Sequence, residues 1–393
     1  MRIAYTAEQQ QLRDELREYF ARLVTPERRE ALSSQSGEVG SGTVYRDIVA
    51  QMGHDGWLTL GWPKEYGGQE RSMIDQLIFT DEAAIAGAPV PFLTINSVAP
   101  TIMHYGSEEQ KNYFLPKISA GELHFSIGYS EPGAGTDLAS LRTTAVRDGD
   151  DWIINGQKMW TSLIAYADYV WLACRTDQDA KKHKGISMFI VPTDAEGFSW
   201  TPVHTMAGPD TSATYYQDVR VPATALVGEV NGGWPLMTNQ LNHERVALTS
   251  AAPLQTSLAE VLEWAQNTKA TDGSRIIDRE WVQINLARVH AKVEYLKLMN
   301  WEIAWTVGAA PNKYDASACK VYGTELATEA YRLLMEVLGA SAYLRQGSPG
   351  AAIRGRIERW HRSALILTFG GGTNEVQRDI IAMTALRQPP AKR

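Results

Sequence analysis

The fold is decided by three stretches in the middle of the chain: YVWLACR (169–175), ISMFIVP (186–192) and ATYYQDVRVP (213–222). All three are rich in β-branched and aromatic residues, which favour strands. The pairs Asp148-Gly149 and Asn155-Gly156 are typical of tight turns between antiparallel strands. The sequence therefore predicts a β domain of hairpins, which we place at residues 123–230.

Helical patterns flank this domain on both sides. Apolar residues recur at helical spacing near the start of the chain, at Leu12, Leu16, Phe20 and Leu23. Capping boxes are predicted at Thr6 with Gln9 and at Ser107 with Gln110. We therefore predict an N-terminal helical domain (1–122) before the β domain and a helical bundle (231–393) after it.

Composition limits the possible partners and the compartment. The 393 residues carry a formal net charge of −7 without basic runs, which argues against binding to nucleic acid. The only cysteines, Cys174 and Cys319, have no metal-ligand spacing, so we expect no metal site and a reducing compartment. Neither a signal-like N-terminus nor a run of about 18 apolar residues is present, so we expect a cytoplasmic protein with no membrane partner.

Glu244 interrupts an apolar stripe. The stripe is formed by Met237, Leu241 and Leu248, which together with Glu244 follow one face of a helix. A carboxylate on such a face either pairs with a neighbour such as Arg245 or has a raised pKa that suits a general base. Position alone leaves both interpretations open.

Three further stretches combine ligand-binding side chains or free backbone. In YSEPGAGTD (129–137), glycines and hydroxyls could cradle a dinucleotide, or the segment could be a plain turn. In QKMWTS (157–162), Trp160 beside Thr161 and Ser162 suits a flavin ring or a core position. FGGGT (369–373) precedes a helical run and offers N–H groups to an anion or carbonyl, or forms a simple turn.

Five segments in order along the chain resemble the acyl-CoA dehydrogenase family: YSEPGAGTD (129–137), NGQKMWTS (155–162), DVRVP and LVGEVNGGW (218–222 and 226–234), LNHERVAL (241–248) and GGGTNEVQR (370–378). The resemblance extends along essentially the whole chain. It is closest to the α-type chains of bacterial heteromeric dehydrogenases that act on CoA esters of cholesterol side chains. It implies a helical domain, a middle β domain, a C-terminal four-helix bundle and FAD as cofactor.

The resemblance also implies roles for single residues. The flavin contacts fall on Tyr129, Ser130, Gly135, Thr136, Trp160, Ser162 and Thr373. The substrate contacts fall on Arg245 and on Thr136, which could face either the FAD pyrophosphate or the CoA.

The catalytic base has two possible places in this family. Many members carry a glutamate just before a Gly-Thr pair near the C-terminus, but this chain has Gly371 there. Isovaleryl-CoA-type members carry the base before an arginine on the first long helix after the β domain, which corresponds to Glu244-Arg245. The resemblance thus implies that Glu244 takes the α-proton of an acyl-CoA and that the Gly371 N–H stabilises the thioester oxygen. The product is a trans-2-enoyl-CoA, and an electron-transferring flavoprotein accepts the electrons.

Two departures from the family pattern concern the partner chain. Family homotetramers complete each flavin site with an Arg-x-Phe-Gly segment and a Gln-x-x-Gly-Gly-x-Gly turn from a neighbour. This chain has ATDG (270–273) and EVLGASA (336–342) there, so carboxylates of Asp272 and Glu336 face a pyrophosphate. We therefore expect an α₂β₂ heterotetramer with a homologous β-type chain.

Three alternatives remain at this point: a branched- or straight-chain fatty acyl-CoA dehydrogenase, a related flavin monooxygenase, and a non-catalytic subunit.

Overall fold

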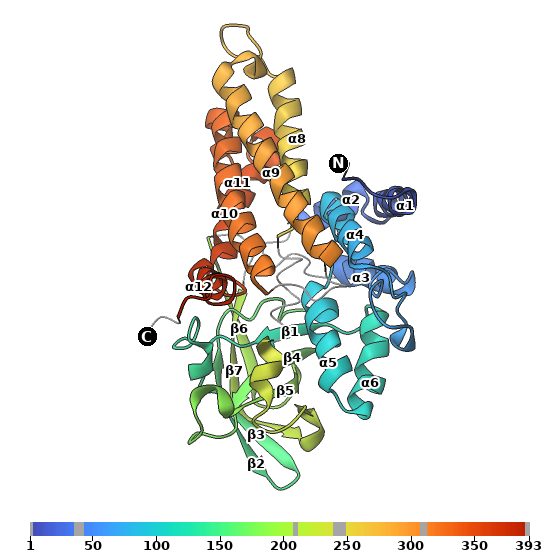
Figure 1. The fold of residues 1–393 in the computed structure, drawn as a ribbon, viewed down its shortest axis with the longest axis vertical. Coiled ribbons are helices and arrows are strands. Elements are labelled where there is room, and N and C mark those ends of the chain that lie inside the picture. Colours follow the sequence, from blue (N-terminus) through green and yellow to red (C-terminus); the bar gives the residue numbers. More distant parts are fainter. Residues whose placement is uncertain (1–2, 35–42, 207–210, 239–248, 307–312, 390–393) are drawn as a thin grey trace.

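The computed structural model describes residues 3–34, 43–206, 211–238, 249–306 and 313–389 (Figure 1). Within these ranges the chain forms an N-terminal group of helices, a β-sheet and a C-terminal helical bundle, which confirms the predicted fold class. The N-terminal helices are α1 (Ala7–Leu23), α2 (Pro26–Ser34), α3 (Thr43–His54), α4 (Met73–Ala86), α5 (Ala99–Tyr105) and α6 (Glu108–Ser119).

Helix α1 begins at the predicted capping box. The Thr6 hydroxyl accepts from the Gln9 N–H, and the Gln9 side chain accepts from the Thr6 N–H. The second predicted capping box starts α6 in the same way. The four predicted apolar positions of α1 are all buried, so this helix packs its apolar face inward, with α4 as a neighbour.

The sheet contains β1 (Phe125–Gly128), β2 (Thr144–Asp148), β3 (Asp151–Lys158), β4 (Tyr169–Arg175), β5 (Ile186–Pro192), β6 (Phe198–Val203), β7 (Thr211–Pro222) and β8 (Leu226–Val227). Its strand order is β6-β7-β3-β2-β4-β5-β8, and β1 also pairs with β4. The pairs β2–β3, β4–β5 and β6–β7 are antiparallel, as a domain of hairpins requires. The pairs β1–β4 and β2–β4 are parallel, so the sheet is mixed rather than built only from hairpins.

One of the two predicted turns is wrong. Gly149 has a positive φ between β2 and β3, which confirms the turn at Asp148-Gly149. Asn155 and Gly156 instead lie inside β3, at a shift in its register with β7. The reason is a close approach of backbone: a Cβ on Gly156 would lie 2.7 Å from the Cα of Thr143. The glycine therefore marks a bulge and not a chain reversal.

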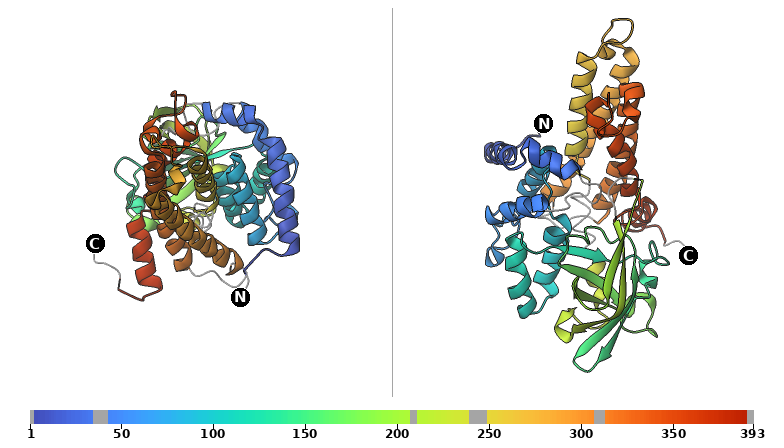
Figure 2. Two further views of the ribbon diagram at one scale, coloured as in Figure 1. Left: turned by 90° about the horizontal axis from the view of Figure 1, so that it is seen from above. Right: turned by 180° about the vertical axis from the view of Figure 1, so that it is seen from behind.

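The C-terminal bundle contains α8 (Ala252–Asn267), α9 (Glu280–Thr306), α10 (Lys313–Leu338), α11 (Arg356–Ala364) and α12 (Asn374–Thr384). It has its own apolar core and projects away from the sheet (Figures 1 and 2). Helix α12 lies where the bundle meets the sheet. Of the helices in the described ranges, none is both long enough and apolar enough to cross a bilayer.

Candidate active site

Two loops predicted to bind the flavin lie side by side. One follows β1 and the other follows β3, and they are joined where the Met159 N–H donates to the Ser130 carbonyl at 2.8 Å. Tyr129 is buried, and its hydroxyl accepts from the Trp171 indole N–H at 3.1 Å. The fold therefore brings Tyr129 and Ser130 next to the strand end that leads to Trp160.

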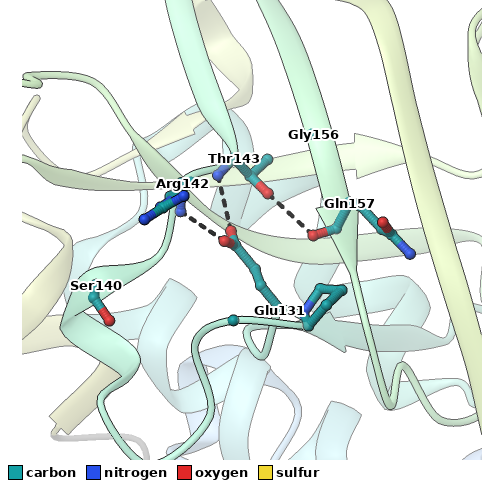
Figure 3. A pocket seen from close by; sticks show the side chains of 8 residues that line it. Glu131, Ser140, Arg142, Thr143, Gly156 and Gln157 are labelled. Atoms are coloured by element: carbon teal, nitrogen blue, oxygen red, sulfur yellow. Dashed lines mark hydrogen bonds between the residues drawn. The ribbon is translucent and has the colours of Figure 1, made fainter.

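A buried ion pair anchors the first loop. The Lys158 side chain is 0% exposed, and its ammonium donates to a Glu131 carboxylate oxygen at 2.8 Å and to the Tyr129 carbonyl at 3.1 Å. The Glu131 carboxylate also accepts from the N–H groups of Arg142 and Thr143, at 2.7 and 2.8 Å (Figure 3). The carboxylate thus closes a turn of the loop onto the start of β2.

The ion pair also sets the charge state of Glu131. Burial alone would raise the pKa of its carboxyl, but the Lys158 ammonium and the Thr143 N–H hold that pKa below its usual range. Burial lowers the pKa of Lys158, and the charge of Glu131 opposes this shift. Glu131 is therefore ionised, and Lys158 supplies its counter-charge. Neither residue was among the predicted site residues, because their contact spans 27 positions in sequence.

Trp160 is not a core residue. It is 56% exposed and has a φ of +64°, a left-handed conformation that is costly for a bulky residue. Its neighbour Thr161 is buried, with its hydroxyl 3.3 Å from that of Thr214. Ser162 is exposed, and its hydroxyl lies 3.3 Å from that of Thr211. The strained loop therefore presents an indole plane and a hydroxyl to the outside, and the core interpretation of Trp160 was wrong.

Gly135 and Thr136 are exposed on the first loop. A Cβ built on Gly133 or Gly135 would meet no atom within 4 Å, so nothing in the described part of the chain requires glycine there. A cavity of about 340 Å³ lies behind the loop, and Figure 3 shows Glu131 and Arg142 at its wall. Its full lining is Glu131, Pro132, Gly133, Ser140, Arg142, Thr143, Gly156 and Gln157. Trp160 and Ser162 do not line it, so it is separate from the face they present.

The third predicted element is the loop 368–374, which leads into α12. The Thr373 hydroxyl caps this helix by accepting from the Val376 N–H at 3.2 Å. Gly371 and Gly372 have φ values of +65° and +88°. Within the described residues, the N–H groups of Gly371, Gly372 and Thr373 donate to no protein acceptor. Among the described residues they are thus open to an external oxygen, which is one of the two interpretations that the glycine run allowed.

Glu244 and Arg245 lie outside the described residues. On the N-terminal side of this gap, Met237 of the predicted stripe is buried. On its C-terminal side, the Ser250 hydroxyl donates to Asp81 on α4 at 2.6 Å. Burial raises the pKa of Asp81 to about 6. Ser250, just after the segment outside the described residues, therefore contacts the N-terminal helices.

Comparison with known proteins identifies the family. Three models match consecutive parts of the chain: the N-terminal domain of acyl-CoA dehydrogenases at residues 6–122, the middle domain at 126–219 and the C-terminal domain at 231–386. The chain is 74% identical to the acyl-CoA dehydrogenase FadE26 of Mycobacterium tuberculosis and 46% identical to FadE29 of the same organism. Both alignments cover 100% of each chain.

Solved structures agree with this result. A chain in the crystal structure of the ChsE4-ChsE5 complex from Mycobacterium tuberculosis is 74% identical, with a TM-score of 0.94. A chain of the Tcur3481-Tcur3483 steroid ACAD is 48% identical, with a TM-score of 0.93. Each match covers 100% of both chains. The family models and the full-length relatives lead to one conclusion: this chain belongs to the acyl-CoA dehydrogenase family.

Proposed function

We propose that this chain dehydrogenates an acyl-CoA thioester between Cα and Cβ to a trans-2-enoyl-CoA, and that its substrate is a CoA ester of a cholesterol side chain. The observation that carries the proposal is full-length identity of 74% and 48% to chains of the ChsE4-ChsE5 complex and of a steroid ACAD. Both matches cover 100% of this chain, so the departures from the family motifs occur within a fold that is otherwise retained.

FAD is the proposed cofactor, and the described residues fit it. An exposed indole at Trp160 and an exposed hydroxyl at Ser162 stand beside the Ser130 segment, and the open glycines leave room for close approach of a ligand. We propose that Tyr129, Ser130, Gly135, Thr136, Trp160, Ser162 and Thr373 hold the cofactor. When bound, FAD supplies the acceptor for the hydrogen that leaves Cβ.

The chain's own residues are proposed to handle the α-proton. The α-hydrogen of a thioester is a weak acid, so its removal requires stabilisation of the charge that develops on the thioester oxygen. We propose that the carboxylate of Glu244 takes this proton, with Arg245 and Thr136 binding the substrate. The Gly371 N–H is the proposed donor to the thioester oxygen, and the lack of an acceptor for it among the described residues supports that role.

A homologous β-type chain is the proposed partner, in an α₂β₂ complex with two flavins. The similar ChsE4-ChsE5 and Tcur3481-Tcur3483 structures each pair two differently named proteins, which supports a heteromeric assembly. Glu336 pairs with Arg332 at 2.5 Å and accepts from Asn285, and Asp272 accepts from Ser274. These carboxylates are engaged inside their own chain and offer no donor to a neighbour's pyrophosphate.

The surface of the bundle and of the segments around it also supports a partner. Large apolar side chains are exposed there within the described ranges, among them Trp281, Ile284, Tyr295, Trp305, Tyr343, Phe369 and Leu386. Exposed apolar area of this kind favours burial against another chain. An electron-transferring flavoprotein remains the proposed electron acceptor, by resemblance to the family. The cytoplasm remains the proposed location, and the free thiols of Cys174 and Cys319 support it.

The substrate proposal is tested by anaerobic flavin reduction in the co-expressed complex. We expect a higher kcat/KM for a steroid side-chain CoA ester than for octanoyl-CoA or palmitoyl-CoA. A preference for either straight chain would overturn the steroid assignment and leave the reaction intact. If no thioester reduced the flavin without oxygen, a monooxygenase or a non-catalytic subunit would explain the chain better.

The assembly proposal is tested by counting flavins. Absorbance of released FAD against the mass of the complex is expected to give one flavin per αβ pair. The chain expressed alone is expected to be poorly soluble or poor in flavin. An active homotetramer of this chain with four flavins would contradict the proposed partner.

A further inference from the structure

A buried lysine holds the loop that carries Gly371. Lys320 on α10 is 1% exposed, and its ammonium donates to the carbonyls of Gly372 at 2.8 Å and Thr368 at 3.2 Å. It also donates to the amide oxygen of Asn374, the first residue of α12, at 2.7 Å. One side chain therefore fixes both ends of the loop 368–374 to α10.

A second side chain completes the attachment. Gln377 on α12 is fully buried, donates to the Gly371 carbonyl at 3.4 Å and accepts from the Ser317 hydroxyl at 2.8 Å. In a trans peptide the carbonyl and the next N–H point in opposite directions. Gln377 on α12 holds the Gly371 carbonyl and Lys320 on α10 holds the Gly372 carbonyl, so the N–H groups of Gly372 and Thr373 point away from these two donors. The held carbonyls of Thr368 and Gly372 bracket Gly371 on both sides.

Packing alone does not explain a lysine here. Removing an ammonium group from water is costly, and an apolar side chain of similar length would fill the same space without that cost. What the ammonium adds is direction, because its donors reach three oxygens of one loop. A backbone donor to a developing oxyanion is effective only when it is held in place before the reaction.

We propose that Lys320 is a positioning residue for the dehydrogenation: its ammonium fixes the loop 368–374 so that the backbone N–H of Gly371 stays directed at the thioester oxygen. The proposal rests on the proposed function of Gly371. In this proposal Lys320 acts on the loop and not directly on the reacting atoms. Its effect is therefore expected on the chemical step and not on binding of the CoA ester.

The test uses the αβ complex and a thioester that can lose its α-proton but cannot be dehydrogenated. The probe is the 3-thia analogue of whichever acyl-CoA reduces the flavin fastest, because sulfur at the β position has no hydrogen to give. The enolate of such a probe is followed by its charge-transfer absorbance with oxidised flavin as the pH is varied. Unfolded or flavin-free molecules do not contribute to this signal.

Three variants are compared with the wild type. Lys320→Met keeps the length of the side chain and removes its donors, and Lys320→Gln keeps an amide donor. The matched control is Lys292→Met on the neighbouring helix α9, whose lysine pairs with Glu329 and makes no contact with the loop among the described residues.

For Lys320→Met we expect the enolate to be at least about tenfold less stabilised, so that a pH at least one unit higher is needed for half-ionisation. We expect kcat to fall about 10- to 100-fold and KM to change less than about threefold. Lys320→Gln is expected to lie between Lys320→Met and the wild type, and Lys292→Met to match the wild type.

A flavin-loaded Lys320→Met complex with enolate absorbance and kcat within twofold of the control would overturn the role of Lys320. If that variant does not assemble, Lys320→Gln and Ser317→Ala undergo the same measurement. Smaller shifts in the same direction support the proposal, and wild-type behaviour in both overturns it. A wild-type complex that gives neither flavin reduction nor enolate absorbance overturns the proposed function itself, before any variant is compared.

Discussion

The loops 129–136 and 368–374 are both held by a buried lysine, but the two lysines bind different partners. Lys158 contacts the Glu131 carboxylate, which lies within its loop and also accepts two backbone N–H groups. Lys320 contacts two backbone carbonyls and an amide oxygen. Among the described residues, the first loop is held by opposite charges, and the second by hydrogen bonds from an ammonium to backbone carbonyls and an amide oxygen.

Because their partners differ, the two lysines are expected to have different main effects: Lys158 on stability and Lys320 on catalysis. Removing Lys158 leaves the charge of Glu131 buried, which is costly wherever the loop lies. Removing Lys320 leaves carbonyl groups without a donor, and a carbonyl can turn toward water if the loop shifts. We therefore expect removal of Lys158 to cause unfolding or loss of the cofactor. Removal of Lys320 is expected to misplace the N–H groups of the second loop.

The largest effect is expected from Lys158→Met. Breaking a buried ion pair typically costs about 3–5 kcal/mol of unfolding free energy, and the complex should lose most of its flavin. Urea denaturation and flavin absorbance measure both quantities. The double variant Lys158→Met with Glu131→Gln should recover part of the loss, because it also removes the unpaired charge. Additive losses in the double variant would show that the pair is not the anchor.

A smaller loss of stability is expected from Lys320→Met. The acceptors left behind cost about 1–3 kcal/mol, and removal of a buried charge offsets part of that. The complex should keep its flavin while its turnover falls. A loss of unfolding free energy as large as that of Lys158→Met, measured under the same urea conditions, would erase the distinction between the two loops.

The glycines of the two loops provide the next comparison. Gly372→Ala is expected to cost about 1–2 kcal/mol, because its φ of +88° is unfavourable with a Cβ and that Cβ would lie 2.8 Å from the Gln377 amide. Gly135→Ala should change the stability of the flavin-free complex by less than about 0.5 kcal/mol, since its Cβ meets no atom within 4 Å. Thermal melts compare the two variants.

Flavin affinity then sharpens the role of Gly135. If this glycine lets the backbone approach the cofactor, Gly135→Ala weakens FAD binding without weakening the apoprotein. Unchanged FAD affinity, measured by titration of the flavin-free complex, would remove Gly135 from the proposed site.

The smallest effect is expected in the pH dependence of the unfolding free energy. The pKa of Glu131 in the folded chain lies below its unfolded value, so the stabilisation it gives is complete above the unfolded value, near 4.5, and is lost as pH falls through the folded value. The stability difference between wild type and Glu131→Gln should therefore shrink in that acid range. A difference that stayed constant from neutral pH down through it would contradict an ionised Glu131.

Local signals in the sequence predicted much of the fold. Capping boxes and apolar spacing located α1 and α6, since these helices are defined by residues three or four positions apart. The predicted turn at Asn155-Gly156 was wrong because Gly156 allows close approach of the Thr143 backbone, and no local pattern indicates this contact. Parallel pairing of β1 with β4 was likewise a long-range property.

For the candidate site as well, local features were predictable and long-range contacts were not. Motifs indicated which loops carry the candidate residues, and the structure adds how the loops are held. Lys320 and Gly372 are 52 positions apart, so no motif links them. The sequence left Trp160 open between a core position and a ligand-facing one, because propensity favours a buried tryptophan in a strand-rich region. Its exposure and its positive φ decide between the two, and neither could be predicted from a local pattern.

The central claim is that this chain removes the α-proton of an acyl-CoA with Glu244, and one measurement tests it most directly. Wild-type and Glu244→Gln complexes with equal flavin content are mixed anaerobically with the preferred steroid-CoA ester, and the loss of flavin absorbance is followed in a single turnover. The account predicts rapid bleaching in the wild type and a rate about 10²- to 10⁴-fold lower in the variant. Bleaching of Glu244→Gln at the wild-type rate would contradict it.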